Sequence, residues 1–298
     1  MQLNHHSDLK TRRSFLKATA GLCAAIPLTA QEPAPRVGLQ TYSLRYEARK
    51  DLPATLALIR KMGFEEVEVS GLYDRSAAEY RRLLDDNGLK AISMMTRYDQ
   101  LDKAVDSAVD DAGRLGAPYV VCSTLPQKTY MTDEEARSGA DFLNSRGEAL
   151  AKADLQFCYH THGTEFAKLG DGTVFDALMK RTDPESANFE MDIYWIVYAH
   201  QSPATLLHRY PGRFPLTHIK DIRTNTVLGG LPRDVREDES VVLGTGIVDI
   251  PAALRAAQAT GVKHHFIEDE AVDATQQIPL SLRYLEASIG RAPCQKPS

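Results

Sequence analysis

Cysteine is scarce in this sequence, and two common cofactor signals are missing. The 298 residues include four cysteines, Cys23, Cys122, Cys158 and Cys294, and no two of them have the C-x-x-C spacing of a zinc or redox pair. A chain of this length buries enough surface to fold without disulfides, so a disulfide scaffold is excluded. No G-x-G-x-x-G follows the first expected strand, which argues against a dinucleotide-binding open sheet.

Positive charge is also in short supply. Lys and Arg total 35 against 40 for Asp and Glu, which gives a formal net charge of -5. A general nucleic-acid binder needs a basic surplus to neutralise phosphates, so we expect no nucleic-acid partner. With 43% hydrophobic and 25% charged residues, the chain has the composition of an ordinary globular protein.

The first thirty residues differ in kind from the rest. Residues 11–17 read Thr-Arg-Arg-Ser-Phe-Leu-Lys and lead into an apolar run over residues 18–30 that is too short to span a bilayer as a helix. This order of features predicts a twin-arginine export signal over residues 1–30, and a single domain over residues 31–298. An ordinary amphipathic helix is the alternative reading of the segment.

Loss of this signal changes the expected location and charge of the protein. Cleavage would place the mature chain in the periplasm or elsewhere outside the cytoplasm, with no membrane segment. It would remove four basic residues and one acidic residue, so the formal charge would fall from -5 to -8.

From Val37 onward the chain repeats a short β-rich apolar run, a loop and a helical pattern. Eight repeats in about 260 residues predict an α/β fold of the (β/α)8 TIM-barrel type. The expected strands are Val37–Tyr42, Glu65–Ser70, Leu89–Met94, Tyr119–Ser123, Leu155–Tyr159, Ala187–Met191, Phe214–Ile219 and His264–Ile267. The clearest helical stretches are Ala54–Met62, Ala77–Asp86, Leu101–Leu115 and Asp133–Ala153. The segment Asp221–Leu243 lacks periodicity, and we expect a long loop there, either a lid or a solvated excursion.

Polar side chains gather where the last four expected strands end. The fifth strand runs into His160 and His162, the sixth into Asp192, the seventh into His218 and Lys220, and the eighth into Glu268. Active sites of such barrels lie at the C-terminal ends of the strands. Any one histidine there is more often a hydrogen-bonded core residue than a ligand, but their joint occurrence with carboxylates favours a site for a divalent cation such as Mn²⁺, Co²⁺, Mg²⁺ or Zn²⁺.

These motifs resemble the xylose isomerase-like sugar phosphate isomerase/epimerase family, whose members include tagatose epimerases, inosose dehydratases and 3-keto-glycoside lyases. The matching segments are Cys158–His162, Glu190–Trp195, Gly212–Phe214 with His218–Asp221, Leu243–Gly246 with Asp249, and Ile267–Glu268. The resemblance covers Val37 to Ser288. It implies metal ligation by His160, Asp192, His218 and Glu268.

One of these positions departs from the epimerases of the family. Those enzymes carry glutamate where this chain carries His160, and they use it with the strand-eight glutamate as paired acid/base groups. The Tyr-His-Thr-His-Gly-Thr stretch from Tyr159 is instead similar to that of the dehydratases, which catalyse elimination.

The resemblance therefore implies an enzyme that removes a proton next to the carbonyl of a free or keto-modified sugar, followed by elimination or isomerisation. Glu268 or His160 would move the proton, and Lys220 or His162 would assist the leaving oxygen, with the pKa of Lys220 lowered by the cation. The substrate-binding candidates are Tyr42, Glu68, Glu165, Trp195 and Arg223.

Two readings from other classes stay open. One is a non-catalytic periplasmic sugar-binding protein, and the other is an apurinic-site endonuclease-like hydrolase, which the acidic charge disfavours. The sequence also leaves open whether the chain acts alone or as a homo-oligomer.

Overall fold

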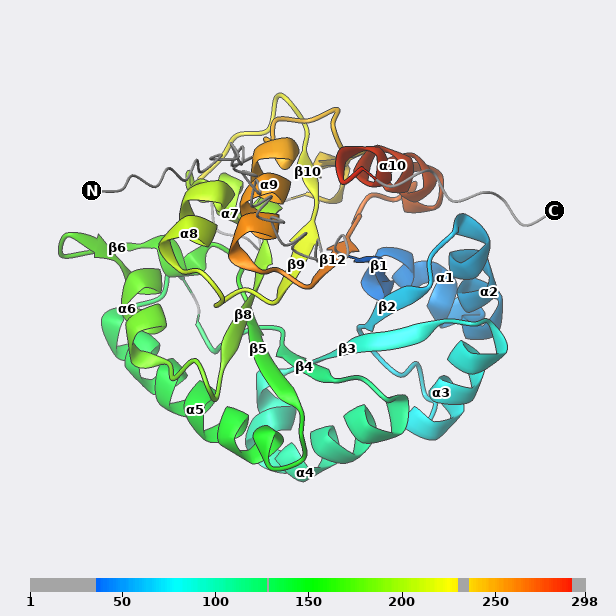
Figure 1. Cartoon of the computed structure of the whole chain (residues 1–298), viewed down its shortest axis with the longest axis horizontal. Helices are drawn as coiled ribbons and strands as arrows, with labels where there is room; N and C mark the ends of the chain where they lie inside the picture. Colours follow the sequence, from blue (N-terminus) through cyan, green and yellow to red (C-terminus); the bar gives the residue numbers. More distant parts are fainter. Residues whose placement is uncertain (1–35, 128, 230–235, 291–298) are drawn as a thin grey trace, which may run out of the picture. The chain divides into compact units, whose positions relative to one another are not determined.

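Eight parallel strands close into a barrel in the computed structural model, which describes residues 36–127, 129–229 and 236–290 (Figure 1). The spatial order is β1–β12–β9–β8–β5–β4–β3–β2, and this closed barrel confirms the predicted fold. The barrel strands are β1 (Arg36–Gln40), β2 (Glu66–Val69), β3 (Lys90–Thr96), β4 (Tyr119–Cys122), β5 (Gln156–His160), β8 (Asn188–Asp192), β9 (Leu216–Ile219) and β12 (His264–Ile267).

Helices follow the strands and surround the barrel (Figure 1). They are α1 (Arg45–Lys50), α2 (Leu52–Met62), α3 (Ala77–Asp86), α4 (Tyr98–Leu115), α5 (Asp133–Ala151), α6 (Val174–Arg181), α7 (Ile193–Tyr198), α8 (Pro203–Arg209), α9 (Ile250–Thr260) and α10 (Ala274–Ser288). Short 3₁₀ helices span Thr41–Leu44, Thr164–Phe166 and Glu237–Glu239. Within the described ranges, no helix combines the length and the apolar character needed to cross a membrane.

Local sequence signals set the helix boundaries. In α3, the Ser76 side chain accepts from the backbone N–H of Glu79, whose carboxylate accepts from the backbone N–H of Ser76, a reciprocal cap. Helix α2 begins after Asp51, which accepts from the Ala54 N–H, and ends at Gly63 with φ of 113°. A residue with a β-carbon adopts that φ only under strain, so the glycine stops the helix.

Two expected strands end one residue later than predicted. Strand β5 extends to His160 and β8 to Asp192, so both candidate ligands lie in the strands themselves rather than beyond them. The extra residues are paired in the sheet, His160 with Glu190 between β5 and β8, and Asp192 with His218 between β8 and β9. The candidate ligands are therefore held by rigid sheet.

The expectation of an irregular segment over Asp221–Leu243 is wrong in part. Strand β10 (Asp221–Ile222) pairs antiparallel with β11 (Ser240–Val241), while residues 230–235 lie outside the described part of the chain. Both carboxylate oxygens of Asp221 accept backbone N–H groups, from Gly244 at 2.9 Å, Gly246 at 2.8 Å and Val248 at 3.0 Å. A β-carbon on Gly246 would lie 2.2 Å from the Ile222 carbonyl oxygen, so only glycine fits there.

Inside the barrel, an apolar layer lies towards the N-terminal ends of the strands and a polar layer lies towards their C-terminal ends. Tyr119, Val121, Cys158, Leu216 and Phe266 form a buried cluster that is distinct from the larger core between the strands and the helices. Because side chains alternate along a strand, residues two positions further on point into the barrel above this cluster. Accordingly, His160 lies two positions after Cys158 on β5, and His218 lies two positions after Leu216 on β9.

The two described cysteines, Cys122 and Cys158, are buried free thiols. Cys23 and Cys294 lie outside the described residues, as does the predicted export signal.

Candidate active site

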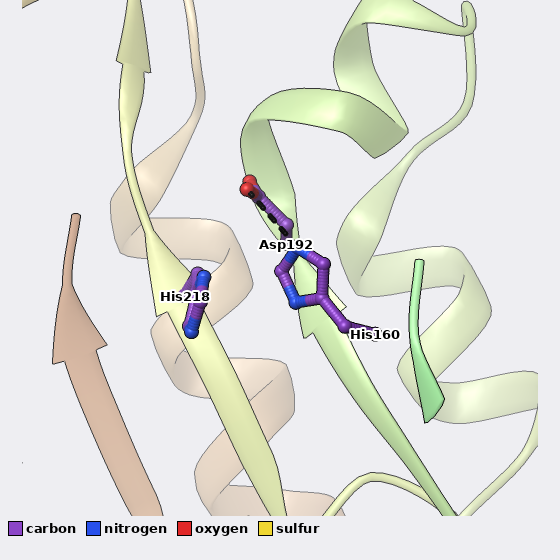
Figure 2. Close-up of side chains that lie close together, drawn as sticks. All are labelled: His160, Asp192 and His218. Carbon is purple, nitrogen blue, oxygen red and sulfur yellow. Dashed lines mark ion pairs between the residues drawn. The ribbon is translucent and has the colours of Figure 1, made fainter. Parts of the chain in front are cut away.

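Three side chains from neighbouring strands converge near the C-terminal end of the barrel. His160 comes from β5, Asp192 from β8 and His218 from β9, and Figure 2 shows the three facing a common point. One potential donor atom of each lies within 4.8 Å of those of the other two. All three side chains are buried. The structure therefore brings three of the four predicted ligands to one place.

The two carboxylate oxygens of Asp192 have different contacts. Its Oδ1 accepts the backbone N–H groups of Tyr194 at 2.8 Å and Trp195 at 3.4 Å, and so caps the N-terminus of α7. Its Oδ2 lies 4.0 Å from Nε2 of His160 and has no hydrogen-bond partner among the described residues. One oxygen thus fixes the carboxylate, and the other is left for a ligand.

Carboxylates behind the two histidines fix their orientation. Nδ1 of His160 lies 2.9 Å from Oε2 of Glu190, and the same oxygen lies 3.2 Å from Nε2 of His218. Nε2 of His218 also lies 2.8 Å from Oε1 of Glu68. A carboxylate beside one ring nitrogen holds the proton there and leaves the other nitrogen as the metal-ligating atom. We therefore assign Nε2 of His160 and Nδ1 of His218 as the donor atoms.

The remaining nitrogen of His218 supports this assignment. Nδ1 of His218 is buried and makes no hydrogen bond within the described part of the chain. This nitrogen lies 3.3 Å from the Glu268 carboxylate, and Oδ2 of Asp192 makes no hydrogen bond either, so a cation between these atoms would satisfy groups that the protein leaves without hydrogen bonds. Two imidazoles with carboxylates form a donor set that suits a divalent cation. The residues therefore fit the metal that the family resemblance implies.

The electrostatics of the cluster also favour a cation. Burial alone lowers the pKa of His218, yet Glu190, Glu268 and Glu68 together raise it well above the ordinary value. Burial raises the pKa of Asp192 to about 7, with Lys220 opposing the rise and Glu268 adding to it. The cluster therefore stabilises positive charge, and a bound divalent cation would carry more positive charge than a proton on one of these residues.

His160 is neutral in this environment, as a metal ligand has to be. Its burial, and the positive charge on His218 nearby, lower its pKa to about 3. With Nδ1 engaged by Glu190 and Nε2 aimed at Asp192, His160 has no nitrogen free to carry a proton to substrate. Of the two roles predicted for His160, the geometry supports ligation.

Glu268 connects this cluster to Lys220. Its Oε2 lies 3.3 Å from Nδ1 of His218 and 3.4 Å from Nζ of Lys220. Burial raises the pKa of Glu268, but Lys220 and His218 outweigh that effect and hold it well below the ordinary value. Glu268 is therefore an ionised carboxylate, which can ligate a cation or accept a proton.

The carboxylates around Lys220 oppose the lowering of its pKa that a bound cation is predicted to cause. Its ammonium is buried, donates to Glu268 and Glu270, and lies 4.9 Å from the ring centroid of Tyr194 and 5.5 Å from that of Trp195. Burial lowers the pKa of Lys220, but Glu268, Glu270 and Asp192 raise it well above the ordinary value. The prediction considered only the cation and missed these carboxylates. Lys220 is suited to donate a proton rather than to remove one.

His162 lies next to His160 on the side of Trp195. Its ring centroid is 4.6 Å from that of His160 and 5.8 Å from that of Trp195. Burial and the neighbouring His160 hold its pKa well below the ordinary value, and its Nδ1 has no hydrogen-bond partner among the described residues. His162 is therefore a neutral imidazole with an unused nitrogen. Trp195 is 7% exposed, and its ring lines the site between His162 and Lys220.

The chain matches the xylose isomerase-like TIM barrel family over residues 56–287. It belongs to this family. An inosose dehydratase from Clostridium beijerinckii is 26% identical over 214 residues, which cover 63% of this chain and 71% of that protein.

Solved structures of the family show the same architecture. A sugar phosphate isomerase/epimerase from Parabacteroides distasonis has 25% identity and a TM-score of 0.70, with 87% of this chain and 96% of that chain covered. The IolI protein, solved with a bound zinc atom, has 14% identity and a TM-score of 0.68, with 86% of this chain and 98% of that chain covered. At 14% identity the likeness shows the fold alone.

Three predicted substrate contacts have partners within the protein. Glu68 is fully buried and bonded to Gln40, Ser93 and His218, so it positions a histidine instead of lining a sugar pocket. Glu165 is also fully buried, where it accepts from the Tyr159 hydroxyl. Arg223 is exposed, and its Nε donates to the Asp238 carbonyl at 2.7 Å. Strand alternation explains the position of Glu68, because a polar residue near a strand end can point into the packed interior, whereas Glu165 lies in the 3₁₀ helix Thr164–Phe166.

Tyr42, a predicted substrate contact, lies in the 3₁₀ helix that follows β1. It is 40% exposed, its ring stacks 4.6 Å from the guanidinium of Arg45, and the charges of Glu270 and Glu268 reach it.

Glu190 is the functional residue that the sequence reasoning missed. It was noted only as part of a motif, yet it holds both histidines. Its position two residues before Asp192 on the same face of β8 is a signal that could have revealed it.

Proposed function

We propose that this protein is a divalent-metal-dependent lyase or isomerase that acts on a keto-sugar or a keto-modified glycoside by removing a proton next to the carbonyl. The observation that carries the proposal is the pair of buried donor atoms that make no hydrogen bond among the described residues, Oδ2 of Asp192 and Nδ1 of His218, with Glu268 3.3 Å from that nitrogen and Lys220 3.4 Å from Glu268. A bound divalent ion would supply Lewis-acid stabilisation of the negative charge that develops on the substrate oxygen. His160, Asp192, His218 and Glu268 would hold it.

Glu268 is the proposed base. Its ionised carboxylate takes the C–H proton next to the carbonyl, and the C–H electron pair becomes the double bond of an enediolate. His162, a neutral imidazole with an unused Nδ1, is the other group in the cluster that is able to accept a proton.

Lys220 is the proposed acid. In elimination, the enediolate electrons expel the oxygen on the next carbon, and the Lys220 ammonium gives that oxygen its proton. In isomerisation, the proton returns to the neighbouring carbon instead. Elimination is favoured because His160 is committed to ligation, so the second carboxylate of a symmetric epimerisation is absent from this position.

The experiment compares wild-type protein with Asp192→Asn, which keeps an acceptor for the α7 cap but removes the anionic ligand. Both would be assayed on a panel of keto-sugars and 3-keto-glycosides, with metal content measured in parallel. We expect activity that EDTA abolishes and added Mn²⁺, Co²⁺ or Zn²⁺ restores, and neither activity nor bound metal in the variant. Full activity without metal would overturn the proposal and favour another chemistry, whereas ligand binding without turnover would favour a binding protein.

We also propose that the chain is exported through its N-terminal twin arginines. The support is the sequence of residues 1–30 alone. Replacement of Arg12 and Arg13 by lysine is expected to retain the protein in the cytoplasmic fraction of a bacterial host, and unchanged export would contradict the proposal.

A further inference from the structure

One buried guanidinium lies where three segments meet at the mouth of the barrel, the end at which the strands have their C-termini. Arg45, the first residue of α1, is 3% exposed. Its Nη2 donates to Oε1 of Glu237 at 2.7 Å and to the backbone carbonyl of Glu270 at 3.2 Å, and its Nη1 donates to the carbonyl of Tyr42 at 3.2 Å. Arg45 therefore connects the segment after β1, the segment before β11 and the segment after β12.

Two tyrosine rings enclose this guanidinium. The ring centroids of Tyr42 and Tyr46 lie 4.6 Å and 4.5 Å from Cζ of Arg45. The Tyr46 hydroxyl also donates to Oε1 of Glu237, at 2.8 Å. The stacked rings and the hydrogen bonds together leave the guanidinium few alternative positions.

The stability of the fold does not by itself account for a buried arginine at this place. Burial of a charged group is costly, and replacement of a buried ion pair by apolar side chains is often neutral or stabilising. A guanidinium differs from an apolar side chain, and from lysine, because it has five N–H donors in a rigid planar fork. What Arg45 adds is therefore a fixed geometry between the segments that it joins.

The segment after β12 is held on both sides of Glu270. The Glu270 N–H donates to the Ser240 hydroxyl on β11 at 3.4 Å, and the Glu270 carbonyl accepts from Arg45. One residue earlier, the Asp269 N–H donates to the Ser43 hydroxyl at 3.0 Å. Both polar groups of the Glu270 backbone are thus held, which fixes the direction of its side chain.

The Glu270 side chain in turn holds Lys220. Its carboxylate accepts from the Lys220 ammonium, and Oε2 of Glu268 lies 3.4 Å from the same ammonium. The two carboxylates compete for one positive charge, and of the two only Glu268 is the proposed base. Without Glu270, Coulomb attraction would draw Lys220 towards Glu268 and make that base less reactive. Glu270 therefore keeps the proposed acid apart from the proposed base.

We propose that Arg45 is a positioning residue for Lys220 and that it acts through the backbone of Glu270. This inference rests on the proposed function, in which Lys220 is the acid, and it assigns a role to a side chain outside the cluster of candidate metal ligands. Arg45 sets where the Glu270 carboxylate lies, and this carboxylate sets where the ammonium lies.

Three substitutions separate the parts of this arrangement. Arg45→Lys keeps the positive charge but loses the planar fork. Glu270→Gln keeps the shape of the side chain but loses its negative charge. Lys220→Met removes the group through which the other two residues are proposed to act.

Arg213 provides the matched control. Its guanidinium also stacks on a ring, that of Phe189 at 5.3 Å, and also donates to backbone carbonyls, those of Met179 and Ala187. Arg213 precedes β9, at the opposite end of that strand from Lys220. Arg213→Lys therefore makes the same chemical change without touching the segments around Lys220.

The first measurement is steady-state kinetics on methyl 3-keto-glucoside with metal bound. Arg45→Lys and Glu270→Gln are each expected to lower kcat about 10–100-fold with little change in KM, since small displacements of a reacting group have effects of this size. In the Lys220→Met background the same substitutions should change kcat by less than about twofold, because residues that act only through Lys220 then have no further effect. Arg213→Lys should keep the wild-type kcat.

The second measurement does not depend on turnover. Trace labelling with acetic anhydride, followed by mass spectrometry, compares the reactivity of Lys220 with that of the exposed Lys152 in the same sample. Lys220 is 2% exposed and donates to two carboxylates, so we expect slow labelling in the wild type. Labelling of Lys220 should be several-fold faster in Arg45→Lys and in Glu270→Gln, because its contacts open more often, and unchanged in Arg213→Lys.

Three results would overturn the inference and leave the proposed function standing. They are a wild-type kcat in Arg45→Lys, a loss of kcat that persists in full in the Lys220→Met background, and a rise in KM with kcat unchanged, which would place the effect at the adjacent Tyr42 ring. Labelling of Lys220 that stays slow in Arg45→Lys, or that rises equally in Arg213→Lys, would also overturn it.

Failure of the proposed function would appear differently, as wild-type protein that turns over no keto-sugar even with metal. In that case, faster labelling of Lys220 in Arg45→Lys and Glu270→Gln but not in Arg213→Lys would still support the connection from Arg45 through Glu270. Equal labelling of Lys220 in the wild type and all of these variants would contradict it.

Discussion

The two halves of the barrel mouth carry different chemistry on the same scaffold. Strands β5, β8, β9 and β12 present imidazoles, carboxylates and an ammonium, buried and connected to one another. Strands β1 to β4 end around an open cavity with methionines, hydroxyls and one tyrosine. The first half is suited to hold reacting atoms in one geometry, whereas the second half is an open cavity that is also lined by charged side chains of both signs, among them Lys103 and Asp111.

We expect the largest effect from removing the negative charge of Asp192, which lies in the half of the barrel mouth formed by β5, β8, β9 and β12. Asp192→Asn should reduce turnover below about one thousandth of wild type, since the cation and its stabilisation of developing charge are lost together. Metal analysis and steady-state kinetics check this. The far-ultraviolet circular dichroism spectrum should stay native, and an active variant would show that this half is not the reaction centre.

A smaller effect is expected at Lys220, which acts on the leaving oxygen and binds no metal. Lys220→Met should lower kcat by about 10²–10⁴-fold on a methyl glycoside, as expected for loss of a general acid. A nitrophenyl glycoside, whose phenolate leaves without a proton, should lose much less. An equal loss on both substrates would contradict the role of Lys220 as acid.

The supporting carboxylates allow a direct comparison between the halves. Glu190 lies in the first half and contacts both histidines, whereas Glu68 reaches only His218 from β2. Loss of such a partner costs about 10–100-fold in metal affinity. We expect Glu190→Gln near the upper end of this range and Glu68→Gln near the lower end, measured by metal titration. Equal effects would mean that the Glu190–His160 contact does not orient a ligand.

The smallest effect is expected outside both halves. Arg223 was predicted to bind substrate, but it lies exposed and donates to Asp238. Arg223→Ala should change kcat/KM by less than about twofold, because surface substitutions away from such sites have small effects. A larger drop in the same kinetic assay would restore Arg223 to the site.

The comparison also separates what the sequence could predict from what it could not. The barrel follows from local periodicity, although among its strands only β9 and β12 end at the predicted residue, and α3 lies at its predicted bounds, Ala77–Asp86, where Ser76 caps one end and Asn87 follows the other. The convergence of His160, Asp192 and His218 follows from the rule that strand ends meet at one face.

The errors concern long-range contacts. The partners of Lys220 include Glu270, 50 positions away, and Glu68 meets His218 across 150 positions. No local pattern reveals which carboxylates surround a buried charge, so neither the raised pKa of Lys220 nor the interior role of Glu68 was predictable. The cavity was missed for the same reason, because it forms where four loops and α4 meet.

The most direct test of the account is a crystal structure of the protein soaked with Mn²⁺ and measured for anomalous scattering. The account predicts one strong anomalous peak in contact with Nε2 of His160, Nδ1 of His218, Oδ2 of Asp192 and the Glu268 carboxylate, and no such peak in Asp192→Asn crystals. A fully soaked crystal without a peak at this point, or with the ion bound elsewhere, would contradict it.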